Sequence, residues 1–270
     1  MQLKNNLDKF KKISSLGQDE LGFYLIKEDG KYLIEDGIKA KVEENTNVTI
    51  LDLNANSNIY IKSDVNSNIL YLAINNEKSN KTFDVSGNIN YHLISLNKIE
   101  ENFRINLKKE EANADVKVLC LGKAFESKFV QYISHDAKST LSNIYNVGIA
   151  LDSANVSFDT TGKIEKGMAK SNCRQLSRGI IIDDNSKVTS KPILLIDEYD
   201  CFANHGAAIG KISDEDLFYL MSRGLTKNDA FFLILKGIVA PFLDKVNEVF
   251  ESEEIKEEIN SEISKLIESD

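Results

Sequence analysis

The chain has 270 residues, of which 42% are hydrophobic, and a formal net charge of -9 at neutral pH. This length and composition can bury a substantial core, and the acidic balance argues against a nucleic-acid-binding surface. No apolar run reaches the roughly 18 to 20 residues that cross a bilayer, and the first residues lack the apolar core of a signal peptide, so we expect a soluble cytoplasmic protein. Three cysteines cannot all pair, and we expect reduced thiols.

Residues 1–21 predict a short N-terminal helical segment. Leu3, Leu7, Phe10 and Ile13 recur at helical spacing, which favours one amphipathic helix. We expect this helix to lie against the rest of the protein as a brace.

Residues 22–210 consist of many brief runs of β-branched and aromatic residues, separated by Asn, Asp, Ser and Gly. Period-two alternation, as at Val116, Val118 and Cys120, predicts strands and a buried Cys120. The intervening segments are too short for crossover helices, which leaves a coiled parallel β-helix and an antiparallel sandwich or barrel as alternatives. Asparagine suits the corners because it tolerates left-handed backbone conformations.

Residues 211–270 follow a helical pattern. Ser213 with Asp216, and Thr226 with Asp229, have the spacing of capping boxes. The first predicted helix ends at Arg223-Gly224, because glycine readily terminates a helix.

The second predicted helix ends at Gly237, and Pro241 suits the first turn of a third. Ser252 is expected to cap a fourth helix. Its apolar stripe would consist of Ile255, Ile259, Ile263, Leu266 and Ile267.

Between Ser171 and Gly224 four short motifs follow one another. They are Cys173-Arg174-Gln175-Leu176-Ser177-Arg178, Lys191-Pro192, Asn204-His205-Gly206-Ala207 and the run from Asp216 to Gly224. In this order they resemble the SufB/SufD family, the scaffolds of SUF iron-sulfur cluster assembly. The resemblance is strongest from about Ser134 to Ile238. It implies a mainly β fold, with a right-handed parallel β-helix core over 22–210 and a C-terminal helical domain over 211–270.

The resemblance also implies a function. The chain would be a non-enzymatic scaffold subunit that dimerises through its β-helix with a second SufB/SufD-type chain, identical or different, and binds a SufC-type ABC ATPase through its C-terminal helices. The sequence has no phosphate-binding Gly-x-x-x-x-Gly-Lys-Ser/Thr loop, so ATP would be hydrolysed by that partner. A sulfur donor is a further implied partner, and reduced flavin a further candidate cofactor. The residues implied nearest the ATPase are Leu217, Phe218, Tyr219, Arg223 and Gly224. Leu217 and Phe218 fit internal packing equally well.

A scaffold needs soft ligands that bind iron and sulfide and then release them. His205 is the leading candidate, because the SufD branch of the family has a functional histidine at this corner. Cys201, four residues earlier, would share its face in a regular strand, and Cys173 is a third candidate. Three scattered cysteines are too few for a closed four-thiolate site, so we expect iron or a transient iron-sulfur cluster shared across the dimer interface.

Two positions decide between the branches of the family. Where the SufB branch carries a cysteine and a glutamate, this chain has Ser177 and Gly206, so it resembles the SufD branch. SufD-like sequences often have a cysteine two residues before the histidine, and here that residue is Ala203, which leaves the ligand set open.

Two alternative functions remain at this point. The first is a purely structural subunit that dimerises and docks the ATPase while a SufB-like partner carries the cluster chemistry. The second is a carbohydrate-active β-helix enzyme, which would need paired carboxylates at matched depth. The candidate acids are Asp183, Asp184, Asp197, Glu198 and Asp200, and their turn positions favour ordinary corner roles.

Overall fold

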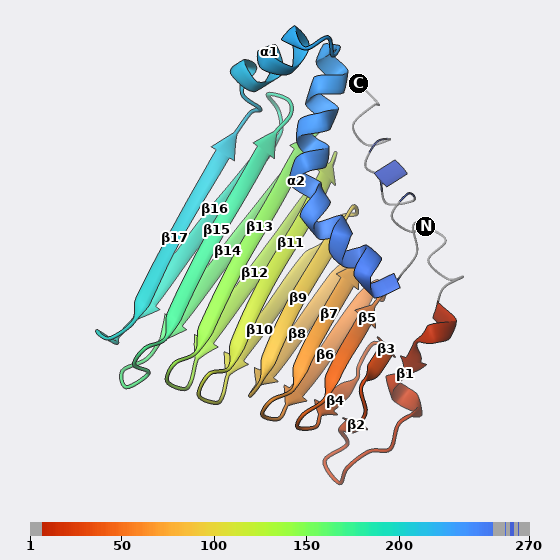
Figure 1. Ribbon diagram of the computed structural model, residues 1–270, viewed down its shortest axis with the longest axis vertical. Coiled ribbons are helices and arrows are strands. Elements are labelled where there is room, and N and C mark those ends of the chain that lie inside the picture. Colours follow the sequence, from red (N-terminus) through yellow and green to blue (C-terminus); the bar gives the residue numbers. More distant parts are fainter. Residues whose placement is uncertain (1–6, 251–256, 258–259, 262–263, 265–270) are drawn as a thin grey trace.

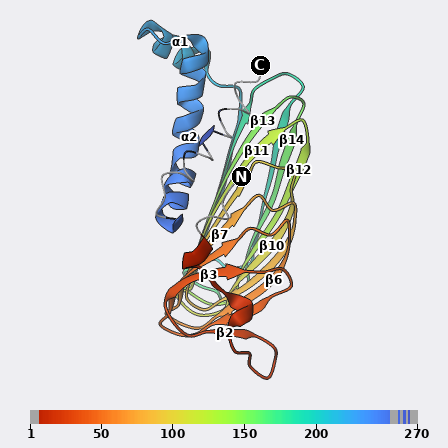
Figure 2. The same ribbon diagram turned by 90° about the vertical axis from the view of Figure 1, so that its right-hand side faces the viewer.

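The computed structural model consists of two long parallel β-sheets that face each other, with a helix lying along the outer surface of one of them (Figures 1 and 2). The structure describes residues 7–250, 257, 260, 261 and 264. No helix among these residues combines the length and apolar character needed to cross a membrane.

The chain alternates between the two sheets, so each coil contributes one strand to each. Sheet A has nine strands, which are β1 (Lys11–Lys12), β3 (Gly30–Ile34), β5 (Asn47–Asp52), β7 (Asn68–Ile74), β9 (Asn88–Ser95), β11 (Asn113–Lys123), β13 (Leu141–Leu151), β15 (Asn172–Ile181) and β17 (Phe202–Gly210). Sheet B has eight, which are β2 (Tyr24–Ile26), β4 (Lys39–Val42), β6 (Asn56–Ser63), β8 (Lys78–Val85), β10 (Glu100–Leu107), β12 (Glu126–His135), β14 (Asn155–Ile164) and β16 (Lys187–Ile196).

Every strand pairs in parallel with the strand one coil away, as in β13 with β11 and β15. Coils lengthen along the chain, from the 21 residues that separate Asn47 and Asn68 to the 31 that separate Thr140 and Ser171. The parallel β-helix is therefore confirmed, and the antiparallel sandwich or barrel is wrong.

The C-terminal halves of the central strands of sheet A (β7, β9, β11 and β13) are buried on both faces, which is why they are so apolar. In β11, Val116, Val118 and Cys120 point into the core between the sheets, whereas Leu119 and Leu121 point outward to a second apolar cluster. The prediction of a buried Cys120 is confirmed, since this side chain is fully buried. A strand that is apolar on both faces needs a cover on each side, and a long helix supplies the outer one.

Asparagine side chains reinforce the stacking of coils. Asn68 Nδ2 donates to Asn47 Oδ1, and Asn88 Nδ2 donates to Asn68 Oδ1, both at 2.8 Å. The asparagines with a left-handed backbone at corners are Asn45, Asn66 and Asn75, as the sequence predicts for this residue type.

The predicted N-terminal helix is wrong. The 3-10 turn η2 (Ile13–Ser15) follows β1 directly. Ile13 enters the core between the sheets, whereas Phe10 packs against Phe250 on the outer side of sheet A, with ring centroids 5.8 Å apart. Side chains on one face of a short helix cannot pack into two cores on opposite sides of a sheet, as Phe10 and Ile13 do. Leu3 lies outside the described residues.

Two helices follow the last strand, α1 (Asp214–Ser222) and α2 (Lys227–Phe250). Both predicted caps are confirmed, because the hydroxyl of Ser213 accepts N–H bonds from the first turn of α1, and Thr226 Oγ1 accepts the Asp229 N–H at 3.2 Å. The predicted end of α1 is also confirmed, with Gly224 in the left-handed region at a φ of 98°.

The predicted break at Gly237 and the third helix at Pro241 are wrong, because α2 continues through both residues. A proline inside a helix costs about 3 kcal/mol, since it removes one backbone hydrogen bond. Burial of a long apolar stripe on sheet A offsets this cost. The buried residues of α2 are Ala230, Leu235, Ile238, Val239, Phe242, Leu243, Val246, Val249 and Phe250. The predicted cap at Ser252 and the stripe from Ile255 to Ile267 lie outside the described residues.

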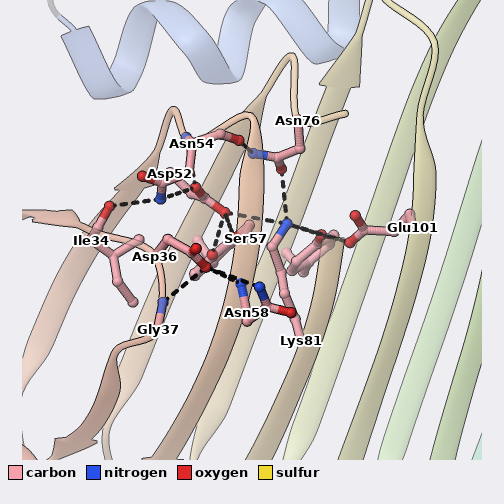
Figure 3. Close-up of polar contacts among 12 residues, drawn as sticks. Ile34, Asp36, Gly37, Asp52, Asn54, Ser57, Asn58, Asn76, Lys81 and Glu101 are labelled. Carbon is pink, nitrogen blue, oxygen red and sulfur yellow. Dashed lines mark hydrogen bonds and ion pairs between the residues drawn. The ribbon is translucent and has the colours of Figure 1, made fainter. Parts of the chain in front are cut away.

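A fully buried lysine occupies the middle of the core (Figure 3). Lys81 Nζ on β8 lies 3.3 Å from Asp52 Oδ2 of β5 and 3.4 Å from Glu101 Oε1 of β10. It also donates to Asn76 Oδ1 at 2.9 Å. Because these groups come from both sheets and from successive coils, the ionic cluster fixes how the coils stack.

The cluster is electrically coupled. Burial alone would raise the pKa of Asp52, but the Lys81 ammonium and hydrogen bonds from Ser57, Tyr71 and the Asn54 N–H together lower it. Burial, reinforced by the neighbouring carboxylates, raises the pKa of Tyr71 well above its ordinary value of 10.0. The Asp52 carboxylate is therefore charged and Tyr71 is a neutral donor at pH 7.

Replacing Lys81 with Met should lower the free energy of unfolding by about 3–5 kcal/mol, because it leaves two buried carboxylates without their cation. Denaturant unfolding at pH 7 measures this loss. Lys78→Met, at the exposed start of the same strand, is the matched control and should change stability by less than about 0.5 kcal/mol.

Acidification provides a second readout of the same cluster. In the wild-type protein, the pKa of Asp52 is lower in the folded state than in the unfolded state. Its contribution to stability is therefore complete above the unfolded pKa of about 3.9, and it is lost as the pH falls through the folded pKa. In Lys81→Met, burial without the ammonium raises the folded pKa of Asp52 instead. The free energy of unfolding of this variant should therefore increase as the pH falls from about 7 to 5. Equal losses in Lys81→Met and Lys78→Met would contradict this account of the core.

Candidate functional site

The candidate ligands gather at the end of the β-helix where the coils stop. In the described part of the chain, β17 pairs only with β15, and β16 pairs only with β14, so each sheet has an open edge here (Figure 1). Cys173 lies on β15, His205 lies on β17, and Cys201 immediately precedes β17. All three therefore belong to the last two coils.

The register places His205 on the inward side of its strand. Partners on neighbouring parallel strands project to the same side, and His205 pairs with the buried Gln175. Ile209, four residues later, also faces inward, since a Cβ on the interior residue Gly179 would lie 3.0 Å from its Cγ2. His205 is nevertheless exposed, because no further coil among the described residues covers its side chain.

Cys173 lies two residues before Gln175 on β15, and its side chain is fully buried. Burial raises the pKa of its thiol, although a hydrogen bond with Ser142 acts in the opposite direction. Gly162, on the facing sheet, makes room for the sulfur, because a Cβ there would overlap Cys173 Sγ and lie 2.9 Å from Gln175 Nε2. Cys173 is thus held as a neutral thiol under the last coil.

Cys201 is partly exposed and lies in the bend before β17, so the assumption of one regular strand from Cys201 to His205 is not met. Its Sγ donates to the Glu198 carbonyl oxygen at 3.1 Å. Partial burial, followed by the charges of Glu198 and Asp200, raises the pKa of this thiol. An incoming cation would have to displace the proton.

The candidate ligands share a region without converging. Among the residues that the structure describes, no three or more His, Cys, Asp or Glu side chains are placed to hold a metal ion. His135 is a structural residue, because its ring nitrogens contact Thr140 Oγ1 at 2.7 Å and Ser142 Oγ at 2.9 Å. Burial lowers its pKa to about 4, so the ring is neutral.

A shallow pocket of about 470 Å³ crosses β13, β15 and β17 beside His205. Its lining includes Tyr145, Arg174, Leu176 and Asn204. In the sequence, Gln175 stands out only as part of the motif from Cys173 to Arg178, and Gly162 does not stand out. Their alternation in the strands was visible, but the register that brings them beside His205 and Cys173 was not.

The residues implied at the ATPase contact divide into two groups. Leu217 is buried, whereas Phe218 and Tyr219 are 73% and 58% exposed. The Arg223 guanidinium stacks over the Tyr219 ring at 5.2 Å from its centroid. Gly224 is the left-handed residue that ends α1. α1 therefore presents an exposed aromatic pair at the top of the molecule in Figure 1.

Comparison with known proteins identifies the class. Residues 29–238 match the family described as SUF system FeS cluster assembly, SufBD core domain. The chain belongs to this family, because the match covers more than half of its length. The matched region includes every strand from β3 to β17 and α1.

Individual relatives match over part of their length. The chain is 35% identical over 142 residues to the iron-sulfur cluster assembly protein SufD of Bacillus subtilis, which is 52% of this chain and 32% of that protein. An iron-sulfur cluster assembly SufBD family protein of Pyrococcus horikoshii is 39% identical over 89 residues, which is 32% of this chain and 20% of that protein. A SufBD family protein of Mycobacterium tuberculosis is 31% identical over 134 residues, 50% of this chain and 15% of that protein. The matches thus span about a third or less of these relatives.

Thiol alkylation of the native protein should modify Cys201 first, because it alone of the three cysteines is partly exposed. Reaction at pH 7 should be slow and should accelerate at higher pH, since burial and neighbouring acids raise its pKa. Cys120, whose pKa burial raises to about 12, should react only on unfolding. Mass spectrometry of timed digests measures the order, and rapid modification of Cys120 in the folded protein would contradict the described packing.

Proposed function

We propose that this chain is a SufD-like scaffold subunit that pairs with a second SufB/SufD-type chain at the open end of its β-helix. The observation that carries the proposal is the pair of uncovered edge strands, β16 and β17, at the end that holds the SufD-like motifs. Open parallel edges expose unpaired backbone groups, and proteins normally cover them. Apolar side chains are also exposed on or beside these strands, including Leu195 and Phe202.

A second scaffold chain would complete the ligand set. One chain offers an exposed imidazole, His205, and a partly exposed thiol, Cys201. When two chains face each other, the number of metal-ligating side chains doubles. Iron or a nascent cluster, as cargo, could then be held by nitrogen and sulfur ligands from both chains. Binding would release the Cys201 proton, and the raised pKa of that thiol favours its return and hence release of the cargo.

The ATPase partner is assigned to the helical end. Phe218 and Tyr219 on α1 expose aromatic surface of the kind that anchors protein interfaces. A SufC-type ATPase docked here would sit at the end of α2, whose apolar stripe lies along sheet A. Closure of an ATPase pair would then be transmitted through α2 to the β-helix and its open edge.

A purely structural subunit is the second candidate function. Two observations favour it, namely the absence of a three-ligand group within the described ranges and the raised pKa values of Cys173 and Cys201. In this case the chain would hold the ATPase and the dimer, and a SufB-type partner would carry the cluster chemistry.

Co-purification with the SufC-type ATPase of the same organism tests the docking surface. The double substitution Phe218→Glu with Tyr219→Ser should weaken the complex at least tenfold, because loss of buried aromatic anchors typically costs about 2 kcal/mol or more. Leu21→Glu, which changes an equally exposed apolar residue outside the helical end, is the matched control. Deletion of α2 is unsuitable, since it would uncover the outer core of sheet A. Equal binding by wild type and the double variant would refute docking through α1.

Anaerobic reconstitution with iron and sulfide separates the two candidate functions. For a cluster-binding scaffold, His205→Ala with Cys201→Ser should reduce the iron bound per dimer by at least half, while the dimer mass measured by light scattering is retained. Asn185→Ala, at an exposed turn outside this site, serves as the control for handling losses. Unchanged iron in a mixed complex with a SufB-type chain would assign the chain to the structural role.

A further inference from the structure

The amide of Gln175 has one satisfied end and one unsatisfied end. Its Nε2 donates to the Ile193 carbonyl oxygen at 3.4 Å, and because a carbonyl only accepts, this contact identifies the nitrogen. Its Oε1 is buried and has no hydrogen-bond partner among the described residues, although the side chain is only 4% exposed. A buried acceptor left without a donor requires an explanation.

One coil further along the β-helix, the register partner of Gln175 is His205, whose imidazole can donate a hydrogen bond. The two residues are register partners on β15 and β17, so their side chains project to the same side from strands about 4.8 Å apart. The exposed ring can rotate, whereas the buried amide cannot.

The facing sheet holds the Gln175 amide in place. Ile193 belongs to β16, and Gly162 of β14 leaves a space that the amide fills, since a Cβ there would lie 2.9 Å from Nε2. The acceptor is therefore fixed by sheet B before any ligand arrives. Such preorganisation is expected of a group that orients a metal ligand.

We propose that Gln175 is a positioning residue for His205, whose ring N–H donates to Gln175 Oε1. This bond fixes one neutral tautomer and directs the lone pair of the other ring nitrogen toward the open edge, where iron cargo would bind. Metal-ligating histidines usually donate their second N–H to a fixed acceptor. A neutral amide, unlike a carboxylate, adds no charge to the ligand, which suits a site that must release its cargo. The inference rests on the proposed ligand role of His205.

The test uses the full chain with nitrogen-15-labelled histidine at about pH 8.5, where an ordinary imidazole is neutral. The His205 signals are assigned by their loss in His205→Ala. In wild type we expect a protected ring N–H resonance for His205, which Gln175→Leu abolishes. Ser177→Ala is the matched control, because Ser177 lies two residues after Gln175 on β15 and is also buried. This substitution should leave the resonance unchanged.

Gln175→Leu should fold, because it replaces an unsatisfied buried acceptor with an apolar group of similar size. A thermal unfolding midpoint at or above that of wild type verifies this. An identical His205 resonance in wild type and in folded Gln175→Leu would overturn the proposal.

Ferrous ion affinity of the assembled complex gives the second readout. Removing an outer hydrogen-bond partner weakens metal binding by about 10–100-fold, so Gln175→Leu should show this loss. If no form binds ferrous ion while the protected resonance still depends on Gln175, the ligand role of His205 fails and the hydrogen bond stands. If ferrous ion binds equally to wild type and Gln175→Leu, the positioning role fails and the ligand role stands.

Discussion

Parallel stacking of coils is the constraint on which the rest of the structure depends. Each coil forms its backbone hydrogen bonds with the coils on both sides, and the register carries every inward side chain into a row that runs along the β-helix. The last coil has a neighbour on one side only. His205 is exposed for that reason alone, because its row is buried at Gln175, one coil earlier.

Buried polar side chains have different surroundings in the middle of the β-helix and near its end. Around Lys81, charges from several strands compensate one another, and the result stabilises the stack. One coil before the end, Gln175 Oε1 has no partner among the described residues, and Cys173 is a buried thiol with a raised pKa. These two side chains lie next to the candidate ligand His205 in the stack.

The outer face of sheet A joins the β-helix to its helices. Leu119 and Leu121 point outward from β11 into the cluster that α2 covers, and Phe10 reaches Phe250 at the other end of the same surface. This shared apolar contact keeps α2 continuous across Pro241. It also leaves α1 outside the packed region, where Phe218 and Tyr219 are exposed.

The family, the strand-rich core and both helix caps were predictable from local patterns in the sequence. These patterns are the short motifs, the period-two alternation and the capping boxes, and each depends only on residues close together in the chain. Tertiary structure decided the rest. Phe10 and Ile13 have helical spacing but serve cores on opposite sides of sheet A, and α2 passes Gly237 because long-range burial outweighs local propensity. The pairing of Gln175 with His205 depends on a register 30 residues apart along the chain, which no local pattern encodes. Local signals therefore identified the candidate ligand His205, and only the stacking of coils showed which side chain lies beside it.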